Sequence, residues 1–158
     1  MDLNDWILAF HLISAVALIA AVTMFSVTIA AVWQSDDPAA VTSFMRVGLV
    51  GNVLVTIGSL GTIIFGVWLA ISLDAYQLWD GWVIAAIILW FVAIGIGKQA
   101  GDGYRATSEM AAQLDSSGSP RSPELAAAMG VTRAFWMHCI STLLIFLILV
   151  DMIWKPGA

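Results

Sequence analysis

Four long apolar stretches, separated by more polar segments, dominate the hydrophobic pattern of this chain. The first runs from Trp6 to Trp33 without one Asp, Glu, Lys or Arg, and its only histidine is His11. An uncharged run of this length predicts a membrane-spanning helix, because about 20 residues cross the hydrocarbon core. A helix also satisfies every backbone N–H and C=O group within the segment, which lipid cannot do.

The other stretches have the same character and complete a set of four predicted spans, at about residues 6–33, 49–73, 82–98 and 134–154. Consecutive spans of one chain cross the membrane in alternating directions, so neighbouring spans should be antiparallel. The pattern therefore predicts an all-α fold, an up-down-up-down four-helix transmembrane bundle that forms a single membrane domain over residues 1–158.

The polar segments indicate where the helices begin and end. Asp37 and Pro38 are typical of a helix start, so the second helix should begin before its apolar part. The polar residues after Lys98 either continue the third helix or restart it after the glycines. Residues 116–123 are the clearest loop, and Ser122 should cap a fourth helix that runs to about Trp154.

Composition supports a membrane protein and excludes some partners. Hydrophobic residues make up 61% of the 158 residues and charged residues 11%, whereas a soluble domain has about 25% charged residues. The net charge of -5 argues against nucleic acid as a partner, since that would need a basic face. The lipid bilayer is the expected partner, and the eight tryptophans suit anchoring at its interfaces.

Basic residues predict the orientation. Five of the six flank the first and third connections: Arg46, Lys98, Arg105, Arg121 and Arg133. Basic residues are retained in the cytoplasm, so both termini should lie outside a bacterial plasma (inner) membrane. The helices look longer than a bilayer needs, and the surplus should extend on the cytoplasmic side.

Small residues recur every four positions on two of the predicted helices. They are Gly58, Thr62 and Gly66 on the second, and Ala93, Gly97 and Gly101 on the third. Such rows let helix backbones approach closely. They indicate either packing within the bundle or the face of a homo-oligomer. Asn52 and Thr56, one turn apart on the second helix, favour an interhelical hydrogen bond over a ligand site.

Two histidines are candidates for cofactor binding, because ionisable groups within a membrane are functional candidates. A haem b held between His11 and His138 is one hypothesis, but the predicted depths of the two residues differ by about 17 Å. His138 alone is either a satisfied bundle histidine or part of a haem, quinone or proton site on the cytoplasmic side.

Asp151 interrupts the last apolar run and lies at about the same predicted depth as His11. A contact between His11 and Asp151 would form an outward-facing site for a proton or a metal ion. The alternative is that Asp151 pairs with Lys155 one turn on, and that His11 bonds to a helix backbone or to Ser14. The sequence has no phosphate-binding loop, nucleophile elbow or HExxH motif.

The first stretch, WILAFHLISAVALIAAV, and the ending LILVDMIWKPGA resemble a loose group of bacterial four-helix membrane proteins. The group includes the copper-resistance D domain, the four-helix membrane protoporphyrinogen oxidase and related integral membrane proteins of unknown function. In the oxidase, a histidine of the first helix is paired with a lysine early in the third helix for haem chemistry, and the resemblance implies the same pair here. His11 matches the first position, whereas the start of the third stretch has no lysine.

Two classes of function therefore remain open. The first is an integral membrane protein without a recognisable catalytic site, acting as an accessory subunit of another membrane protein or as a homo-oligomer. The second is a redox protein that binds haem b or a metal ion through His11, with Asp151 or His138 in support. The first class is preferred, because no site is complete in the sequence, and an enzymatic role is not expected.

Overall fold

Helices form most of the computed structural model, which describes all residues except 1, 36, 74–76, 119–121, 131 and 157–158. In chain order they are α1 (Leu3–Trp33), α2 (Pro38–Ser72), α3 (Gly81–Ser116), α4 (Pro123–Met129) and α5 (Arg133–Trp154). No strand occurs in the described part of the chain.

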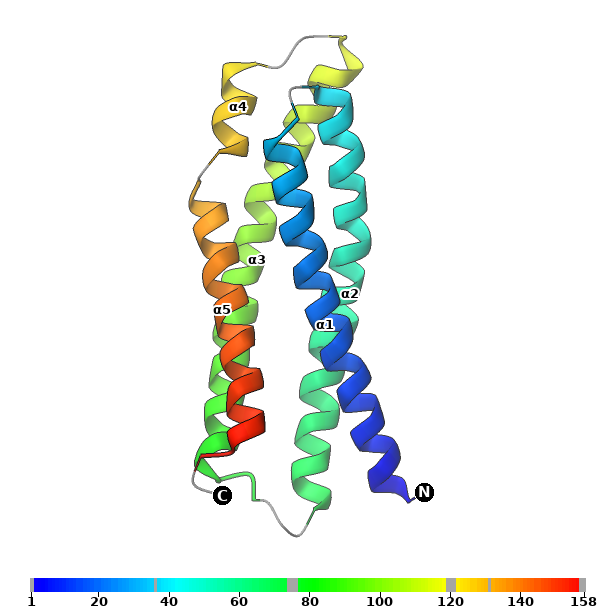
Figure 1. Ribbon diagram of the computed structural model, residues 1–158, viewed down its shortest axis with the longest axis vertical. Coiled ribbons are helices and arrows are strands. Elements are labelled where there is room, and N and C mark those ends of the chain that lie inside the picture. The colour runs from blue at the N-terminus through cyan, green and yellow to red at the C-terminus, as the bar shows by residue number, and fades with distance from the viewer. Residues whose placement is uncertain (1, 36, 74–76, 119–121, 131, 157–158) are drawn as a thin grey trace.

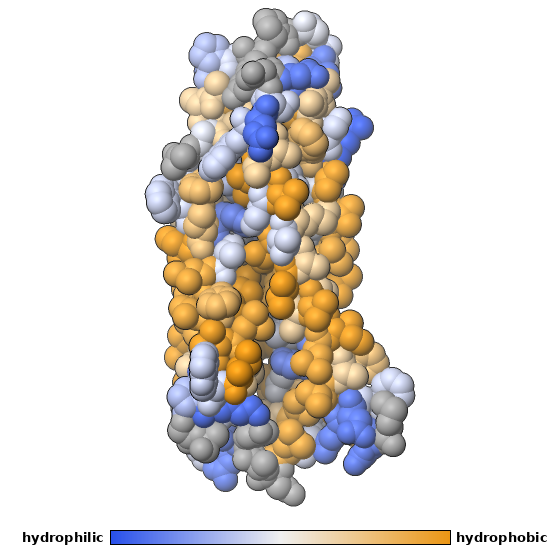
Figure 2. Space-filling view, in the orientation of Figure 1, coloured by the Kyte–Doolittle hydropathy of each residue, from blue (hydrophilic) through white to orange (hydrophobic). Residues whose placement is uncertain are grey.

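Within the described residues, four stretches are long and apolar enough to cross a membrane: α1, α2, α3 and the stretch Pro123–Trp154 that ends with α5. Successive stretches run in opposite directions, so both termini lie at one end, the terminal end, and α4 lies at the other, the α4 end (Figure 1). Apolar side chains cover the middle of the molecule between more polar ends (Figure 2). The predicted up-down-up-down bundle is confirmed, and the chain is a multi-pass membrane protein.

The start of α2 and the course of α3 follow from local chemistry. The Asp37 carboxylate accepts a hydrogen bond from the Ala39 N–H at 3.0 Å, and Pro38 occupies the first helical position. Helix α3 continues through its glycines to Ser116. Of the two alternatives for the polar segment after Lys98, the structure therefore has the continuous helix.

The fourth predicted helix is interrupted, which corrects the expectation of one continuous helix to Trp154. Ser122 caps α4 as predicted, since its hydroxyl accepts from the Leu125 N–H at 3.1 Å. Helix α4 ends at Met129 because Gly130 has an extended backbone, with φ −75° and ψ −163°. Glycine is a weak helix former, and a new helix starts when Thr132 caps α5.

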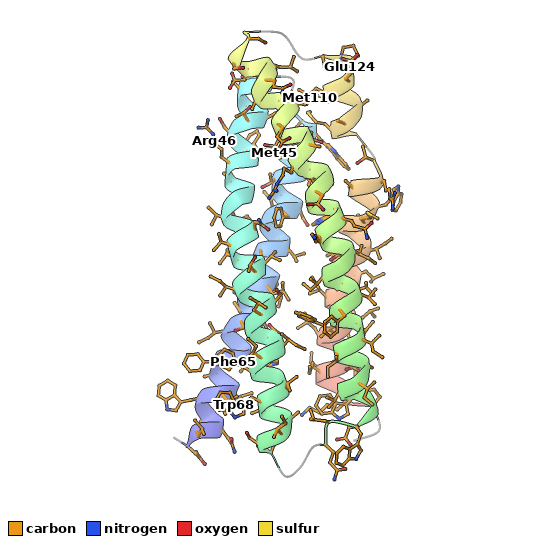
Figure 3. The ribbon with its side chains drawn as sticks, turned by 180° about the vertical axis from the view of Figure 1, so that it is seen from behind. Met45, Arg46, Phe65, Trp68, Met110 and Glu124 are labelled. Carbon is orange, nitrogen blue, oxygen red and sulfur yellow. The ribbon has the colours of Figure 1, made fainter. Side chains whose placement is uncertain are left out.

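The helices associate mainly in two pairs, α1 with α2 and α3 with α5, and α2 also contacts α3. At the α4 end, a cluster of buried apolar side chains ties α1, α2, α3 and α4 together: Val32, Val41, Ala111, Leu125 and Met129. Met45 and Met110 pack against it from α2 and α3 (Figure 3). We call these five buried residues the α4-end cluster.

Candidate functional site

His11 lies on the side of α1 that faces α2. Its Nδ1 is 3.1 Å from the Thr62 carbonyl oxygen. Because a carbonyl only accepts, Nδ1 carries the proton and Nε2 carries the lone pair. The ring fits closely because residue 66 is glycine: a Cβ there would lie 2.9 Å from His11 Cε1. Helix α2 thus forms a recess that holds the imidazole in one orientation.

The structure does not bring His11 to Asp151. No hydrogen bond or salt bridge between them is seen among the described residues, and α1 and α5 diverge toward the terminal end (Figure 1). The arrangement seen is the predicted alternative, a histidine bonded to a helix backbone. In the described part of the chain, no three His, Cys, Asp or Glu residues gather as a metal site would require.

Asp151 lies on α5, and its Oδ2 is buried with no hydrogen-bond partner among the described groups. A buried polar atom without a partner is costly in a low-dielectric surrounding. The Nζ atom of Lys155, one turn further along, lies 5.6 Å from the centroid of the Trp82 ring. This cation–π contact joins the end of α5 to the start of α3.

His138 lies on α5 and faces α1 in the half of the bundle near the α4 end. Its Nε2 is 3.0 Å from the hydroxyl of Ser26 on α1. The imidazole lines a crevice of about 230 Å³ between α1 and α5, together with Trp33, Phe135 and Cys139. The rings of Trp33 and Phe135 are in contact, with centroids 4.9 Å apart.

The two histidines lie at different levels of the bundle. The partner of His138, Ser26, is fifteen residues after His11 on the same helix, which corresponds to about 22 Å along the axis. Two ligands of one iron must lie on opposite sides of a single atom, so a haem held between His11 and His138 does not fit this geometry.

The small residues predicted on α2 face α1. A Cβ at residue 58 would lie 2.6 Å from the backbone nitrogen of Leu18 and 2.9 Å from the Ser14 carbonyl oxygen. Thr62 and Gly66 contact His11, as described above. This row therefore serves packing within the bundle, where α1 and α2 meet backbone to backbone.

The row on α3 has two parts. Ala93 is buried, and its carbonyl accepts a hydrogen bond from the Ser141 hydroxyl of α5 at 2.9 Å. Gly97 faces the same serine, since a Cβ there would lie 2.9 Å from Ser141 Oγ. Gly101 does not take part, because a Cβ there would meet nothing within 4 Å.

Sequence reasoning missed Ser26, Trp33 and Phe135 as neighbours of His138. A hydroxyl every few residues is common in apolar helices, and only the rotation of α1 against α5 decides which one meets the imidazole. The sequence indicates Asn52 as a hydrogen-bonding residue, but the structure is needed to show that its side chain lies on the exposed surface of α2.

Comparison with known proteins gives no further assignment: no family model, curated protein or solved structure matches this chain.

Proposed function

We propose that this protein is a membrane component without a catalytic site of its own that works as a homo-oligomer, assembled through the exposed face of α2. Asn52 carries this proposal. Its side chain is exposed between Val50 and Val53, whose exposed fractions are 57% and 58%. In the described part of the chain, no hydrogen bond of its amide is seen. An amide in lipid gains most from a partner on another helix.

A second copy of the chain is the partner that suits this surface best. An amide group has both donors and an acceptor, so the same residue on two copies related by a two-fold axis can bond to itself. Gly48 and Thr56 lie four residues before and after Asn52 on α2. Thr56 is exposed and small, and Gly48 lies at the border of this face, where a Cβ would be 3.7 Å from the Phe25 ring of α1. Small residues at these positions let a second α2 helix approach.

The test is the oligomeric state of the purified protein in lipid nanodiscs or vesicles, measured by subunit counting after single-molecule photobleaching. We expect a dimer for the natural chain and mostly monomer for Asn52→Leu. Gln99→Leu is the matched control, because Gln99 is an exposed amide on α3 outside this face, and it should remain dimeric. A natural chain that is monomeric, or that associates only with a different protein, would sink the proposal.

We also propose that the chain lies in a bacterial plasma (inner) membrane with both termini outside. The support is the distribution of basic residues: Arg46 lies in the half of α2 nearer the α4 end, and Arg105 lies in that half of α3. Arg133 is the first residue of α5, and Lys98 lies at the middle of α3. Basic residues favour the cytoplasmic side. A reporter that is active only in the cytoplasm should be inactive when fused to the C-terminus, and an active fusion would reverse the orientation.

A second function is favoured by the geometry of His11, namely the binding of haem or a metal ion. A histidine that binds a metal through one ring nitrogen commonly donates the N–H of its other ring nitrogen to a carbonyl. This hydrogen bond fixes the tautomer and leaves the first nitrogen free to bind the metal. His11 makes this bond to Thr62, and within the group that the chain resembles, the protoporphyrinogen oxidase branch would use the residue at this position for haem chemistry. Asp151 and His138 would not share this site, because the contacts of His11 are with α2.

The two functions are separated by a visible spectrum and a metal analysis of the purified protein. A Soret band, or a stoichiometric metal, that is lost in His11→Ala supports the second function. Ser14→Ala is a control on the same face of α1, since the Ser14 hydroxyl donates to the Phe10 carbonyl at 2.7 Å and should leave the spectrum unchanged. A colourless, metal-free protein of full stability would contradict the second function and leave the first intact.

A further inference from the structure

Arg46 is the only charged residue of α2. Its side chain is exposed and projects from α2 away from the neighbouring helices (Figure 3). Within the part of the chain that the structure describes, no carboxylate forms an ion pair with it. A guanidinium group has five N–H donors in a planar fork, so this side chain offers a binding position for an anion from outside the chain.

The position of Arg46 along α2 corresponds to the level of lipid headgroups. Trp68, with an exposed fraction of 47%, marks the membrane boundary near the terminal end, because exposed tryptophans favour that boundary. Arg46 lies 22 residues before Trp68 in the same helix, which corresponds to about 33 Å along the axis. The hydrocarbon core is about 30 Å thick. Arg46 therefore reaches the headgroups of the opposite leaflet, on the side of the α4 end.

Arg46 also belongs to the face of α2 on which the proposed dimer forms. Arg46, Val50 and Val53 follow one another at spacings of four and three residues, which places them on one side of the helix. The two exposed valines flank Asn52, and Arg46 lies six residues before Asn52, about 9 Å along the axis. The two copies of a dimer cross the membrane in the same direction and are related by a two-fold axis. Contact through Asn52 therefore brings both Arg46 side chains to the same level beside the contact.

Two arginines at one level of a contact oppose it unless an anion lies between them. Like charges that face each other across an interface are unfavourable. A phosphate group compensates them well, since it accepts two parallel hydrogen bonds from a guanidinium group. Basic positions between membrane helices on the cytoplasmic side bind anionic lipid headgroups in this way.

We propose that the headgroup of an anionic phospholipid bridges Arg46 of the two copies and strengthens the dimer. The phosphate accepts hydrogen bonds from both guanidinium groups. This proposal rests on the dimer proposed through Asn52 and adds a lipid to that contact. In the monomer a headgroup meets one arginine, and in the dimer it meets two. The lipid therefore binds the dimer more tightly and shifts the equilibrium toward it.

The dissociation constant of the dimer in lipid vesicles tests the proposal, measured by single-molecule photobleaching over a series of protein-to-lipid ratios. The two compositions are phosphatidylcholine alone and phosphatidylcholine with added phosphatidylglycerol. We expect dimerisation of the natural chain to become about fivefold tighter with phosphatidylglycerol, since one additional arginine near an anionic headgroup contributes about 1 kcal/mol. Inorganic phosphate added to vesicles of phosphatidylcholine should not reproduce the effect, because it has no acyl chains to hold it at the membrane.

Substitutions of Arg46 show whether this residue is responsible. Arg46→Gln should make dimerisation independent of phosphatidylglycerol. In phosphatidylcholine alone it should dimerise at least as tightly as the natural chain, because the repulsion between the two arginines is gone. Arg46→Lys keeps the charge but loses the planar fork, so its response should be smaller than that of the natural chain. Arg105→Gln is the matched control, since Arg105 is an exposed arginine of α3, and its response should equal that of the natural chain.

The outcomes separate this proposal from the dimer itself. A natural chain that dimerises equally tightly in both compositions overturns the role of the lipid and leaves the dimer intact. A response to phosphatidylglycerol that persists in Arg46→Gln has the same meaning for Arg46. A natural chain that is monomeric in both compositions overturns the dimer and the bridging lipid together.

Discussion

The contact between α1 and α2 and the α4-end cluster are packed by opposite means. In the first, Gly58 brings two helix backbones together: a Cβ at this residue would lie 2.6 Å from the Leu18 nitrogen. In the second, bulky side chains fill the space between helices, and Leu125 has no exposed surface at all. One region excludes side chains from the contact, and the other is built from them.

The difference follows from the solvent of each region. Burying a leucine stabilises a fold when it removes apolar surface from water. In hydrocarbon that gain is absent, because lipid tails are as apolar as leucine, and helices associate through close backbone packing and hydrogen bonds. The α4-end cluster lies at the more polar α4 end of the molecule (Figure 2), near Glu124 (Figure 3), where water would drive burial. The same chain therefore uses two kinds of core.

The largest expected effect is at the α4-end cluster. Leu125→Ala should lower the free energy of unfolding by about 2–5 kcal/mol, the usual range for a fully buried leucine. Chemical unfolding in mild detergent would measure it, and hydrogen exchange should show the loss in α4. Leu143→Ala is the control, since Leu143 is 56% exposed on α5. Equal losses in the two variants would mean that the cluster is not driven by water.

At the backbone contact between α1 and α2 a larger side chain should lower stability, whereas at the α4-end cluster a smaller one should. Gly58→Ala adds one methyl group and should destabilise the α1–α2 pair by about 1–3 kcal/mol, because the neighbouring atoms are backbone and cannot rotate away. Unfolding in mixed micelles of mild detergent and dodecyl sulfate would measure the change. Gly95→Ala is the matched control: a Cβ there meets nothing within 4 Å. It should be neutral or stabilising by up to about 1 kcal/mol, and destabilisation equal to that of Gly58→Ala would remove the contrast.

The capping residue of α2 connects the two regions, because this helix runs from the α4 end through the membrane. Asp37→Ala removes the acceptor for the Ala39 N–H and should reduce stability by about 1 kcal/mol. Hydrogen exchange should show faster opening confined to the first turn of α2. Asp102→Ala is the control, an exposed carboxylate within α3, and a similar loss there would indicate a general charge effect instead of a lost cap.

The membrane fold could be predicted because a membrane span depends on the hydrophobicity of its residues summed along one segment, and not on contacts between segments. An uncharged run such as 6–33 has no other stable state in lipid than a helix. The break after Met129 was missed for the same reason. The run from Pro123 to Trp154 is helix-compatible in composition, and the extended backbone of Gly130 divides it.

The candidate sites could be predicted only in part, because they depend on helix rotation. Residue spacing gives the depth of His11, but not which neighbour its imidazole meets, and the ring turned out to face Thr62 instead of Asp151. The same holds for His138, whose depth follows from residue spacing. Its crevice depends on the contact between Phe135 of α5 and Trp33 of α1. The hydrophobic periodicity of a single helix cannot predict such a contact between two helices.

The smallest expected effect tests what holds α3 to α5. Ser141→Ala removes the hydroxyl that donates to the Ala93 carbonyl at 2.9 Å. It should lower stability by only about 0.6 kcal/mol, the mean for interhelical hydrogen bonds in membranes, measured by unfolding in the same mixed micelles. The carbonyl keeps its own helical hydrogen bond, so no unsatisfied group is created. Ser43→Ala is the control, since the Ser43 hydroxyl bonds within its own helix to Ala39. Suppose that Ser141→Ala instead lowered stability as much as Gly58→Ala. Side-chain hydrogen bonds would then stabilise the membrane part as strongly as close backbone packing, and the α3–α5 pair would be a third kind of helix contact.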